Sequence, residues 1–235
     1  MARVTPIPIV ALDVPDTGRA LALVMRLGES CGFYKIGGEL FTAAGPSVVE
    51  AVRREGKKVF LDLKFHDIPN TVRASARSAA SQGASLITVH AIGGRAMMAA
   101  AVEGAGSDCG VLAVTVLTSM DANAYSEATG KPVGSVQDEV SRLGRLTRES
   151  GAHGVVCSGH EVARIRSESQ DRLATLVPGV RLAGDSANDQ SRVVTPADAA
   201  REGATYVVLG RTVTASAEPV AAMRRVLENL SSGAR

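Results

Sequence analysis

The sequence predicts a single α/β domain with the (β/α)8 TIM barrel fold, in which eight parallel strands alternate with helices. Eight short runs of apolar and β-branched residues recur along the 235-residue chain, and stretches with helical periodicity lie between them. This alternation is typical of a parallel sheet covered by helices. Because each strand–helix unit takes roughly 25 to 30 residues, the chain fits a closed barrel of about 250 residues better than an open sheet with a second domain.

The predicted strands and helices follow one another in a regular order. The strands cover residues 8–13, 32–36, 58–63, 85–90, 110–117, 154–158, 174–179 and 206–210. The clearest helices, which carry apolar residues three and four positions apart, cover residues 16–28, 70–83, 195–203 and 218–230. Several of them begin near Asp, Asn or Thr and are followed by glycine, the usual signals for helix ends.

No linker or low-complexity segment divides the chain, so residues 1–235 are expected to form one barrel domain. The final residues 231–235, SSGAR, are expected to be a disordered tail without a chemical role. Long polar connections follow the fifth and seventh strands, at residues 119–134 and 181–194. Because such a barrel builds its site from the loops after its strands, these connections are candidate walls or lids.

Composition excludes several kinds of partner. The chain has 26 basic and 24 acidic residues, a formal net charge of +2 and no cationic block, so neither nucleic acid nor an anionic membrane is expected. The apolar run at residues 7–14 is too short to span a bilayer and contains Asp13. The three cysteines are scattered without CxxC spacing, which favours a reducing compartment and predicts a cytoplasmic location.

The segment FLDLKFHDIPNT, residues 60–71, begins like a buried strand and then carries charged residues. Side chains alternate between the two faces of a strand, so Asp62 and Lys64 share one face while Leu61 and Leu63 share the other. If the leucines pack on helices, the two charged side chains point into the mouth of the barrel.

Asp13 and Lys35 lie at the ends of the first two predicted strands. With Asp62 and Lys64, four ionisable groups are expected to converge from three neighbouring strand ends. A lysine held between carboxylates retains its proton, which suits Lys64 to act as an acid. Two carboxylates beside an anionic substrate are unfavourable, and decarboxylation relieves that repulsion by releasing neutral carbon dioxide. A structural ion-pair network is the alternative interpretation of these residues.

Gly210 and Arg211 stand at the end of the eighth predicted strand. The loops after strands seven and eight of such barrels commonly bind phosphate, and the fork-shaped guanidinium of arginine suits phosphate oxygens. A solvated arginine after a turn is the alternative interpretation of this pair.

The segment FLDLKFHDIPNTV closely resembles the signature of the orotidine 5′-phosphate decarboxylase family. The similarity extends to ALDV at 11–14, YKIGGELF at 34–41, TVHAIGG at 88–94, VLTS at 116–119, PGVRLAGDSANDQSRV at 178–193 and LGRT at 209–212. The resemblance implies a homodimeric barrel that converts orotidine 5′-monophosphate to uridine 5′-monophosphate and carbon dioxide, the last step of pyrimidine nucleotide synthesis. It implies no metal ion and no organic cofactor.

The resemblance also implies the catalytic residues Lys35, Asp62, Lys64 and Asp67. Lys64 would donate the proton to C6 of the pyrimidine, and Asp62 would lie beside the departing carbon dioxide. Lys35 would belong to the charge network and contact the ribose. Asp13 would hold a ribose hydroxyl.

Further substrate contacts are implied at the dimer interface and in the loops. Asp67, with Ile68 and Thr71, would reach across the interface and complete the partner's site. Thr118 would meet the pyrimidine amide. The family's phosphate and lid positions fall on Arg181, Gln190, Gly210 and Arg211.

Three other interpretations stand beside this one. The segment HGVVCSGH offers His153, Cys157 and His160 as candidate zinc ligands, but a strand followed by a turn would separate them. Magnesium-dependent hexulose phosphate synthases and keto-gulonate phosphate decarboxylases share the DxKxxD motif, but they carry a metal-binding glutamate where this chain has Lys35. The third interpretation is a barrel that binds a phosphorylated nucleotide without converting it.

Overall fold

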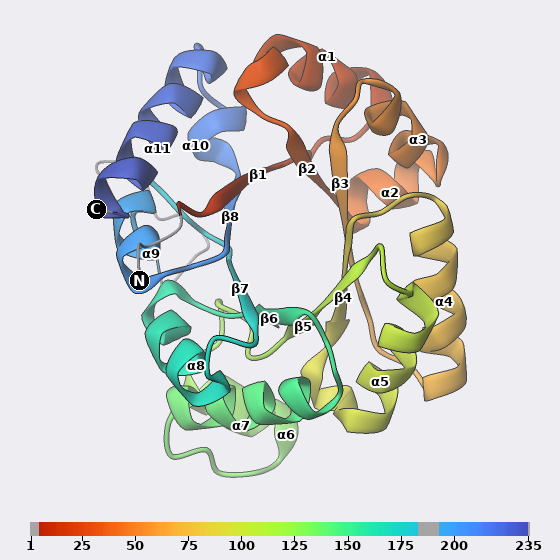
Figure 1. Ribbon diagram of the computed structural model, residues 1–235, viewed down its shortest axis with the longest axis vertical. Coiled ribbons are helices and arrows are strands. Elements are labelled where there is room, and N and C mark those ends of the chain that lie inside the picture. Colours follow the sequence, from red (N-terminus) through yellow and green to blue (C-terminus); the bar gives the residue numbers. More distant parts are fainter. Residues whose placement is uncertain (1–4, 183–192, 235) are drawn as a thin grey trace.

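The fold is a closed barrel of eight parallel strands surrounded by helices, which confirms the predicted fold class (Figure 1). The computed structural model describes residues 5–182 and 193–234. The strands pair in sequence order, and β1 pairs with β8 to close the barrel. They are β1 (Ile7–Ala11), β2 (Phe33–Gly37), β3 (Lys58–Phe65), β4 (Leu86–His90), β5 (Gly110–Val114), β6 (Gly154–Val156), β7 (Ala174–Val177) and β8 (Tyr206–Leu209).

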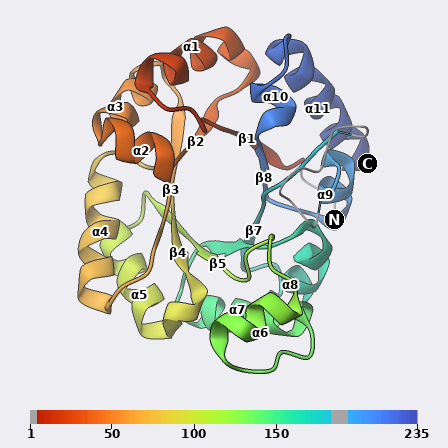
Figure 2. The same ribbon diagram turned by 180° about the vertical axis from the view of Figure 1, so that it is seen from behind.

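The helices pack around the outside of the barrel (Figures 1 and 2). They are α1 (Thr17–Leu27), α2 (Gly38–Ala44), α3 (Ser47–Arg54), α4 (Pro69–Ser81), α5 (Gly94–Ala105), α6 (Ala122–Thr129), α7 (Val136–Glu149), α8 (Val162–Ser169), α9 (Pro196–Glu202), α10 (Arg211–Thr214) and α11 (Pro219–Gly233). Among the described residues they are accompanied by the short 3-10 turns η1 (Gly28–Ser30), η2 (Ala91–Gly93) and η3 (Gly159–Glu161). Within the described residues, none of the helices is long and apolar enough to cross a membrane.

Most of the predicted elements are found where the sequence indicates. All eight predicted strands are present, although the first, fifth, sixth and seventh end two or three residues earlier than expected, at Ala11, Val114, Val156 and Val177. The four clearest predicted helices correspond to α1, α4, α9 and α11.

Local signals explain where several of these helices begin. The Asp16 carboxylate caps α1 by accepting a 2.8 Å hydrogen bond from the N–H of Arg19. Thr195 and Asp198 form a reciprocal capping box at the start of α9. Proline occupies the first turn of α4, α9 and α11, where its missing N–H removes no helical hydrogen bond.

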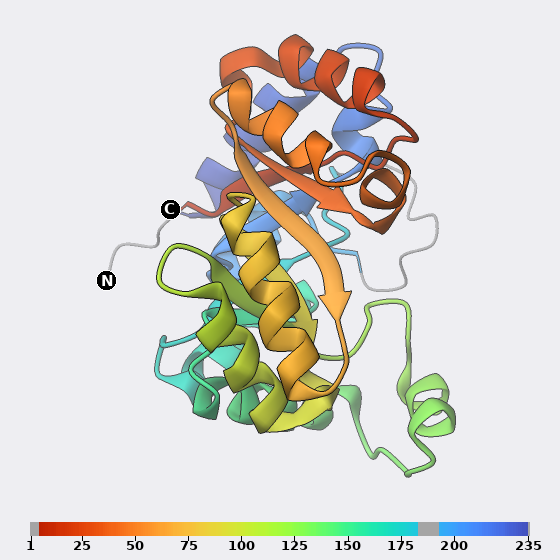
Figure 3. The same ribbon diagram turned by 90° about the vertical axis from the view of Figure 1, so that its right-hand side faces the viewer.

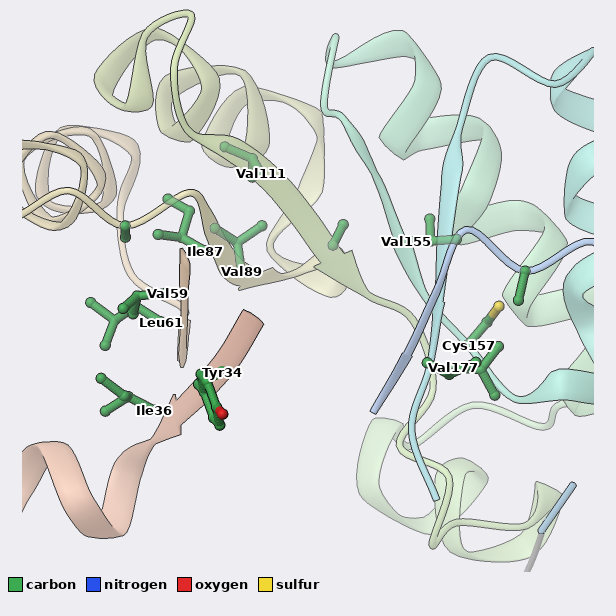
Figure 4. Close-up of a cluster of buried hydrophobic side chains, with 14 of the residues drawn as sticks. Tyr34, Ile36, Val59, Leu61, Ile87, Val89, Val111, Val155, Cys157 and Val177 are labelled. Carbon is green, nitrogen blue, oxygen red and sulfur yellow. The ribbon is translucent and has the colours of Figure 1, made fainter. Parts of the chain in front are cut away.

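The apolar core has two layers, because successive side chains of each strand point to opposite faces. The outer layer lies between the strands and the helices and includes Tyr34, Ile36, Leu61 and Val89 (Figure 4). The inner layer fills the barrel and consists of Ile9, Ala11, Phe33, Phe60, Leu86, Leu112, Leu176 and Val208. Leu61 thus packs outward as predicted, and residues of the same parity as Phe60 point into the barrel.

The C-terminal end differs from the sequence prediction. The prediction of a disordered tail at residues 231–235 is wrong for residues 231–233, because α11 continues to Gly233. Gly233 packs so closely on α9 that a Cβ atom there would lie 2.2 Å from the carbonyl oxygen of Ala197. The lack of a side chain at residue 233 permits this contact between the two helices, and the contact anchors the last turn of α11.

The long connection after β5 contains α6, which projects from the end of the barrel toward which the arrows of β2 and β3 point (Figure 3). The hydroxyl of Tyr125 on α6 donates a 2.8 Å hydrogen bond to Oε1 of Glu139 on α7, which links this connection to α7. The connection therefore stands at the carboxyl end of the strands, where barrels of this kind place their sites.

Candidate active site

Four charged side chains form a row across the mouth of the barrel, at the carboxyl ends of β1, β2 and β3. Lys35 Nζ lies 2.8 Å from Asp13 Oδ1 and 3.8 Å from Asp62 Oδ2. Lys64 Nζ lies 2.9 Å from the same Asp62 oxygen. The sign of the charge alternates along the row, so each carboxylate is next to an ammonium group. The convergence expected from side-chain alternation is observed.

The centre of the row is largely withdrawn from water. The side chains of Lys35 and Asp62 are each 12% exposed, whereas the Asp13 side chain is 59% exposed. Charges act on one another more strongly where fewer water molecules screen them. The contacts of Asp62 therefore contribute more to the field in the site than the exposed carboxylate of Asp13 does.

Strand β3 departs from regular pairing where it carries these charges. Leu61 pairs with Ile87 and Phe65 pairs with Val89, so three residues of β3, 62–64, lie opposite the single residue Thr88 of β4. Lys64 has a φ of 51°, in the left-handed region that residues other than glycine seldom adopt. Such backbone strain persists only where neighbouring contacts hold it, and it clusters at functional sites.

Thr88 is a residue of this site that the sequence analysis missed. Its side chain is fully buried, and its hydroxyl donates a 2.9 Å hydrogen bond to Asp62 Oδ1. The same hydroxyl oxygen accepts a 2.9 Å hydrogen bond from the backbone N–H of Lys64. One signal could have found it: Thr88 has the same parity as Leu86 of the inner layer, which puts its hydroxyl inside the barrel.

A cavity of 240 Å³ opens beside the charged row. Lys35, Asp62 and Lys64 line it on one side, and Thr118 lines it from the connection after β5. The rest of its wall is mostly apolar and consists of Phe60, Val114, Val116, Leu117, Ser119, Val156, Leu176, Pro178 and Val208. An apolar wall with a few convergent polar groups is the usual construction of a small-molecule site.

A second cavity of 400 Å³ adjoins the first, and the two share Lys35, Pro178 and Val208. Arg181, which is 7% exposed, and Arg211, which begins α10, both line it. Its other lining residues are Ala11, Asp13, Gly179, Gly210 and Thr214. Two guanidinium groups in one cavity favour an anion with several oxygen atoms, such as phosphate.

Three of the predicted site residues line neither of the two cavities. Asp67, Ile68 and Thr71 are exposed around the turn from β3 into α4, and Ile68 is 67% exposed. The Asp67 carboxylate accepts a 2.6 Å hydrogen bond from the N–H of Ile68 within this turn. Within the described residues, Lys64 pairs with Asp62 and not with Asp67. Predicted site residue Gln190 lies outside the described residues.

Two histidines lie next to the row. The rings of His66 and His90 are 5.6 Å apart between centroids and are tilted by 47°. Burial lowers the pKa of His90 below its ordinary value; the ammonium group of Lys64 acts in the same direction, and the carboxylate of Asp62 acts against it. His90 is therefore favoured in its neutral form at the edge of the site.

The candidate zinc ligands do not share a site. Cys157 is buried in the outer core layer, and His153 Nε2 lies 3.2 Å from the Tyr206 hydroxyl. His160 is exposed in η3. In the part of the chain that the structure describes, no group of three or more His, Cys, Asp or Glu side chains is arranged to hold a metal ion.

Fold and site together define a class of protein: a (β/α)8-barrel enzyme whose charged mouth adjoins a basic cavity suited to a small anionic substrate. The chain belongs to the orotidine 5′-phosphate decarboxylase / HUMPS family, whose model matches residues 6–226. This match confirms the family resemblance that FLDLKFHDIPNTV and the other segments between residues 11 and 212 indicate.

Curated relatives and solved structures agree with this assignment. The chain is 50% identical over 220 residues to an orotidine 5′-phosphate decarboxylase of Anaeromyxobacter sp. (strain K), covering 94% of this chain and 96% of the relative. It is 48% identical to the enzyme of that name from Alkalilimnicola ehrlichii, covering 95% and 96% of the two chains. A crystal structure of orotidine 5′-phosphate decarboxylase from Lactobacillus acidophilus has 34% identity and a TM-score of 0.85, covering 97% and 99%.

Proposed function

We propose that this protein decarboxylates orotidine 5′-monophosphate to uridine 5′-monophosphate and carbon dioxide, the last step of de novo pyrimidine nucleotide synthesis. The family and the names of its curated relatives support this reaction. The observation that carries the proposal is the row of alternating charges, Asp13, Lys35, Asp62 and Lys64, beside a largely apolar cavity.

Lys64 is the proposed proton donor. Cleavage of the bond between C6 and the carboxylate leaves an electron pair in the plane of the pyrimidine, where the ring's π system does not delocalise it. A fixed ammonium group stabilises that charge and then transfers its proton to C6. The 2.9 Å contact with Asp62 holds Lys64 Nζ in the cavity, so the donor needs little reorganisation during the reaction.

Asp62 has two proposed effects. Its carboxylate orients Lys64 through their direct contact. It also lies beside the position that we assign to the substrate carboxylate, and the repulsion between the two groups falls as neutral carbon dioxide leaves. Because the Asp62 side chain is only 12% exposed, water screens this repulsion weakly.

The two adjoining cavities divide the substrate between them in this proposal. The pyrimidine occupies the 240 Å³ cavity, where Thr118 meets its amide. The ribose lies near Asp13 and near Lys35, which lines both cavities. The phosphate occupies the 400 Å³ cavity. Its proposed ligands are Arg181, Gly210 and Arg211, together with Gln190 from outside the described residues.

A second copy of the chain completes the proposed site. Asp67, Ile68 and Thr71 are exposed and line neither cavity of their own chain, which supports their use by a partner subunit. Ile68 is an apolar side chain that is 67% exposed, as expected for a residue that a dimer interface covers. The proposed assembly is therefore a homodimer with two shared sites.

No metal ion or organic cofactor takes part in the proposed reaction. The family description also names HUMPS proteins, and magnesium-dependent sugar phosphate chemistry is the alternative function. Lys35 Nζ lies 2.8 Å from Asp13 and 3.8 Å from Asp62, so its positive charge occupies the space between the carboxylates that would bind magnesium. This arrangement favours the decarboxylase.

The cytoplasm is the proposed location of the reaction. All three cysteines, Cys31, Cys109 and Cys157, are buried, and none of them is paired in a disulfide within the described residues. Free thiols persist in reducing compartments, which supports this location.

The ultraviolet absorbance of orotidine 5′-monophosphate tests the proposed function. Purified protein in excess EDTA is expected to remove the orotate band, and Lys64→Ala is expected to do so about 10²- to 10⁴-fold more slowly. The matched control is Lys58→Ala, which removes an exposed lysine from the opposite end of β3 and is expected to keep wild-type activity. An unchanged band with folded wild-type protein would overturn the proposal and direct the assay to hexulose phosphates with magnesium.

A further inference from the structure

We infer that Thr88 is a positioning residue for this reaction: its hydroxyl fixes both the carboxylate of Asp62 and the backbone from which Lys64 projects. The inference rests on the proposed function. It adds to the site a residue that does not itself reach the cavity, since Thr88 is absent from the residues that line it.

The register between β3 and β4 is the first observation behind this inference. Between the pairs Leu61–Ile87 and Phe65–Val89, β3 has three residues and β4 has one, Thr88. Two residues of β3 are therefore in excess, and the backbone of this segment cannot follow regular parallel pairing with β4. A backbone N–H group of β3 in this segment therefore needs an acceptor other than the backbone of β4, and a side chain of β4 can supply it.

The Thr88 hydroxyl meets that need. It accepts a 2.9 Å hydrogen bond from the N–H of Lys64, at the residue whose φ of 51° marks the strained point of the strand. A buried N–H without an acceptor is unfavourable, so this bond stabilises the left-handed conformation of Lys64. That conformation sets the direction in which the Lys64 side chain leaves the strand.

The hydroxyl also orients Asp62. Because its oxygen accepts from Lys64, its proton is directed to Asp62 Oδ1, 2.9 Å away. The other carboxylate oxygen, Oδ2, is thereby left to contact Lys64 Nζ at 2.9 Å and Lys35 Nζ at 3.8 Å. One buried hydroxyl thus fixes the plane of the carboxylate on which both ammonium groups converge.

The chemistry of this position is specific to a hydroxyl group. The group must accept one hydrogen bond and donate another within a fully buried space, which serine and threonine can do. Valine has the shape of threonine but neither accepts nor donates. The methyl group of threonine also restricts rotation about χ1, which keeps the hydroxyl aimed at both partners.

Steady-state kinetics of Thr88→Val and Thr88→Ser test the inference. Calorimetric titration with uridine 5′-monophosphate gives the concentration of folded binding sites, by which kcat is normalised. Thr88→Val is expected to lower kcat per binding site by about 10- to 100-fold, because small displacements of reacting groups have effects of this size. Its affinity for uridine 5′-monophosphate, which lacks the reacting carboxylate, is expected to stay within about threefold of wild type. Thr88→Ser is expected to restore kcat to within about threefold.

Two controls separate positioning from a general effect on folding. Thr175→Val removes another fully buried strand threonine, whose hydroxyl oxygen accepts from the N–H of Thr205, and it is expected to keep the wild-type kcat. If Thr88→Val does not fold, the pair Thr88→Ser and Thr88→Ala, which differ by the hydroxyl alone, gives the same comparison.

The outcomes that overturn the inference are distinct from those that overturn the proposed function. A kcat of Thr88→Val within threefold of wild type would refute positioning, and so would a loss of kcat matched by an equal loss of nucleotide affinity. Failure of Thr88→Ser to exceed Thr88→Val or Thr88→Ala would also refute it. A folded wild-type protein that does not decarboxylate orotidine 5′-monophosphate would instead overturn the proposed function.

Discussion

Lys35 Nζ lies 2.8 Å from Asp13 Oδ1, so an ion pair joins the carboxyl ends of β1 and β2 at the mouth of the barrel. The ammonium group also lies 3.8 Å from Asp62 Oδ2 and thereby separates two carboxylates. Because the Lys35 side chain is only 12% exposed, water screens the charge of its ammonium group weakly. Lys35 is therefore expected to influence the whole charged row.

Replacing Lys35 by methionine is expected to reduce kcat/KM for orotidine 5′-monophosphate by on the order of 100-fold or more, as loss of a preorganised charge does. The variant leaves Asp13 and Asp62 without the cation between them. The matched control is Lys58→Met, which replaces an exposed lysine at the other end of the barrel. A Lys35→Met enzyme within a few-fold of wild type would show that the pair is structural.

Arg211→Ala tests the assignment of the 400 Å³ cavity to phosphate. Its kcat/KM for orotidine 5′-monophosphate is expected to fall on the order of 100-fold, which corresponds to about 3 kcal/mol. Its activity on orotidine, which lacks the phosphate, is expected to remain at the wild-type level. The exposed Arg172, on the turn before β7, supplies the control Arg172→Ala. Equal losses on both substrates would count against a phosphate contact.

A heterodimer tests whether Asp67 serves the partner subunit's site. Lys64→Ala and Asp67→Ala homodimers are both expected to be nearly inactive. A heterodimer of the two, purified with two different tags, would carry one intact site and one doubly altered site, and about half of wild-type activity is expected. If Asp67 acts within its own chain, both sites of the heterodimer are defective, and activity close to zero would refute the shared site.

His90 predicts a dependence of stability on pH. Burial lowers its pKa in the folded state, so the unfolded chain takes up a proton at a higher pH, near 6.5, than the folded chain does. Stability is therefore expected to be retained above about pH 6.5 and to fall as the pH is lowered toward the folded-state pKa. Thermal unfolding of wild type and His90→Gln at pH 7.5 and 5.5 measures this, and the variant should show the smaller decrease. Equal decreases in the two proteins would contradict the assignment to His90.

Much of the fold is local in origin, which is why the sequence predicts it. Leu61 packs outward and Phe60 points into the barrel because alternation along a strand depends on backbone geometry alone. The same alternation, applied to Asp13, Lys35, Asp62 and Lys64, brings their charges together at one end of parallel strands. Caps such as Asp16 act over three residues and are equally readable.

Other features depend on contacts between distant segments. The continuation of α11 beyond residue 230 results from the packing of Gly233 against Ala197 of α9, which no signal within SSGAR indicates. The exposure of Asp67 and Ile68 likewise follows from where the turn after β3 lies on the surface.

The sequence by itself determined the eight strand–helix units, the family and the set of charges at the barrel mouth. The tertiary structure alone decided that three residues of β3 lie opposite Thr88 and that its hydroxyl joins Asp62 to the strained backbone of Lys64. The physical reason is that side-chain direction is set within a strand, whereas register is set between strands, by the closure of the whole barrel.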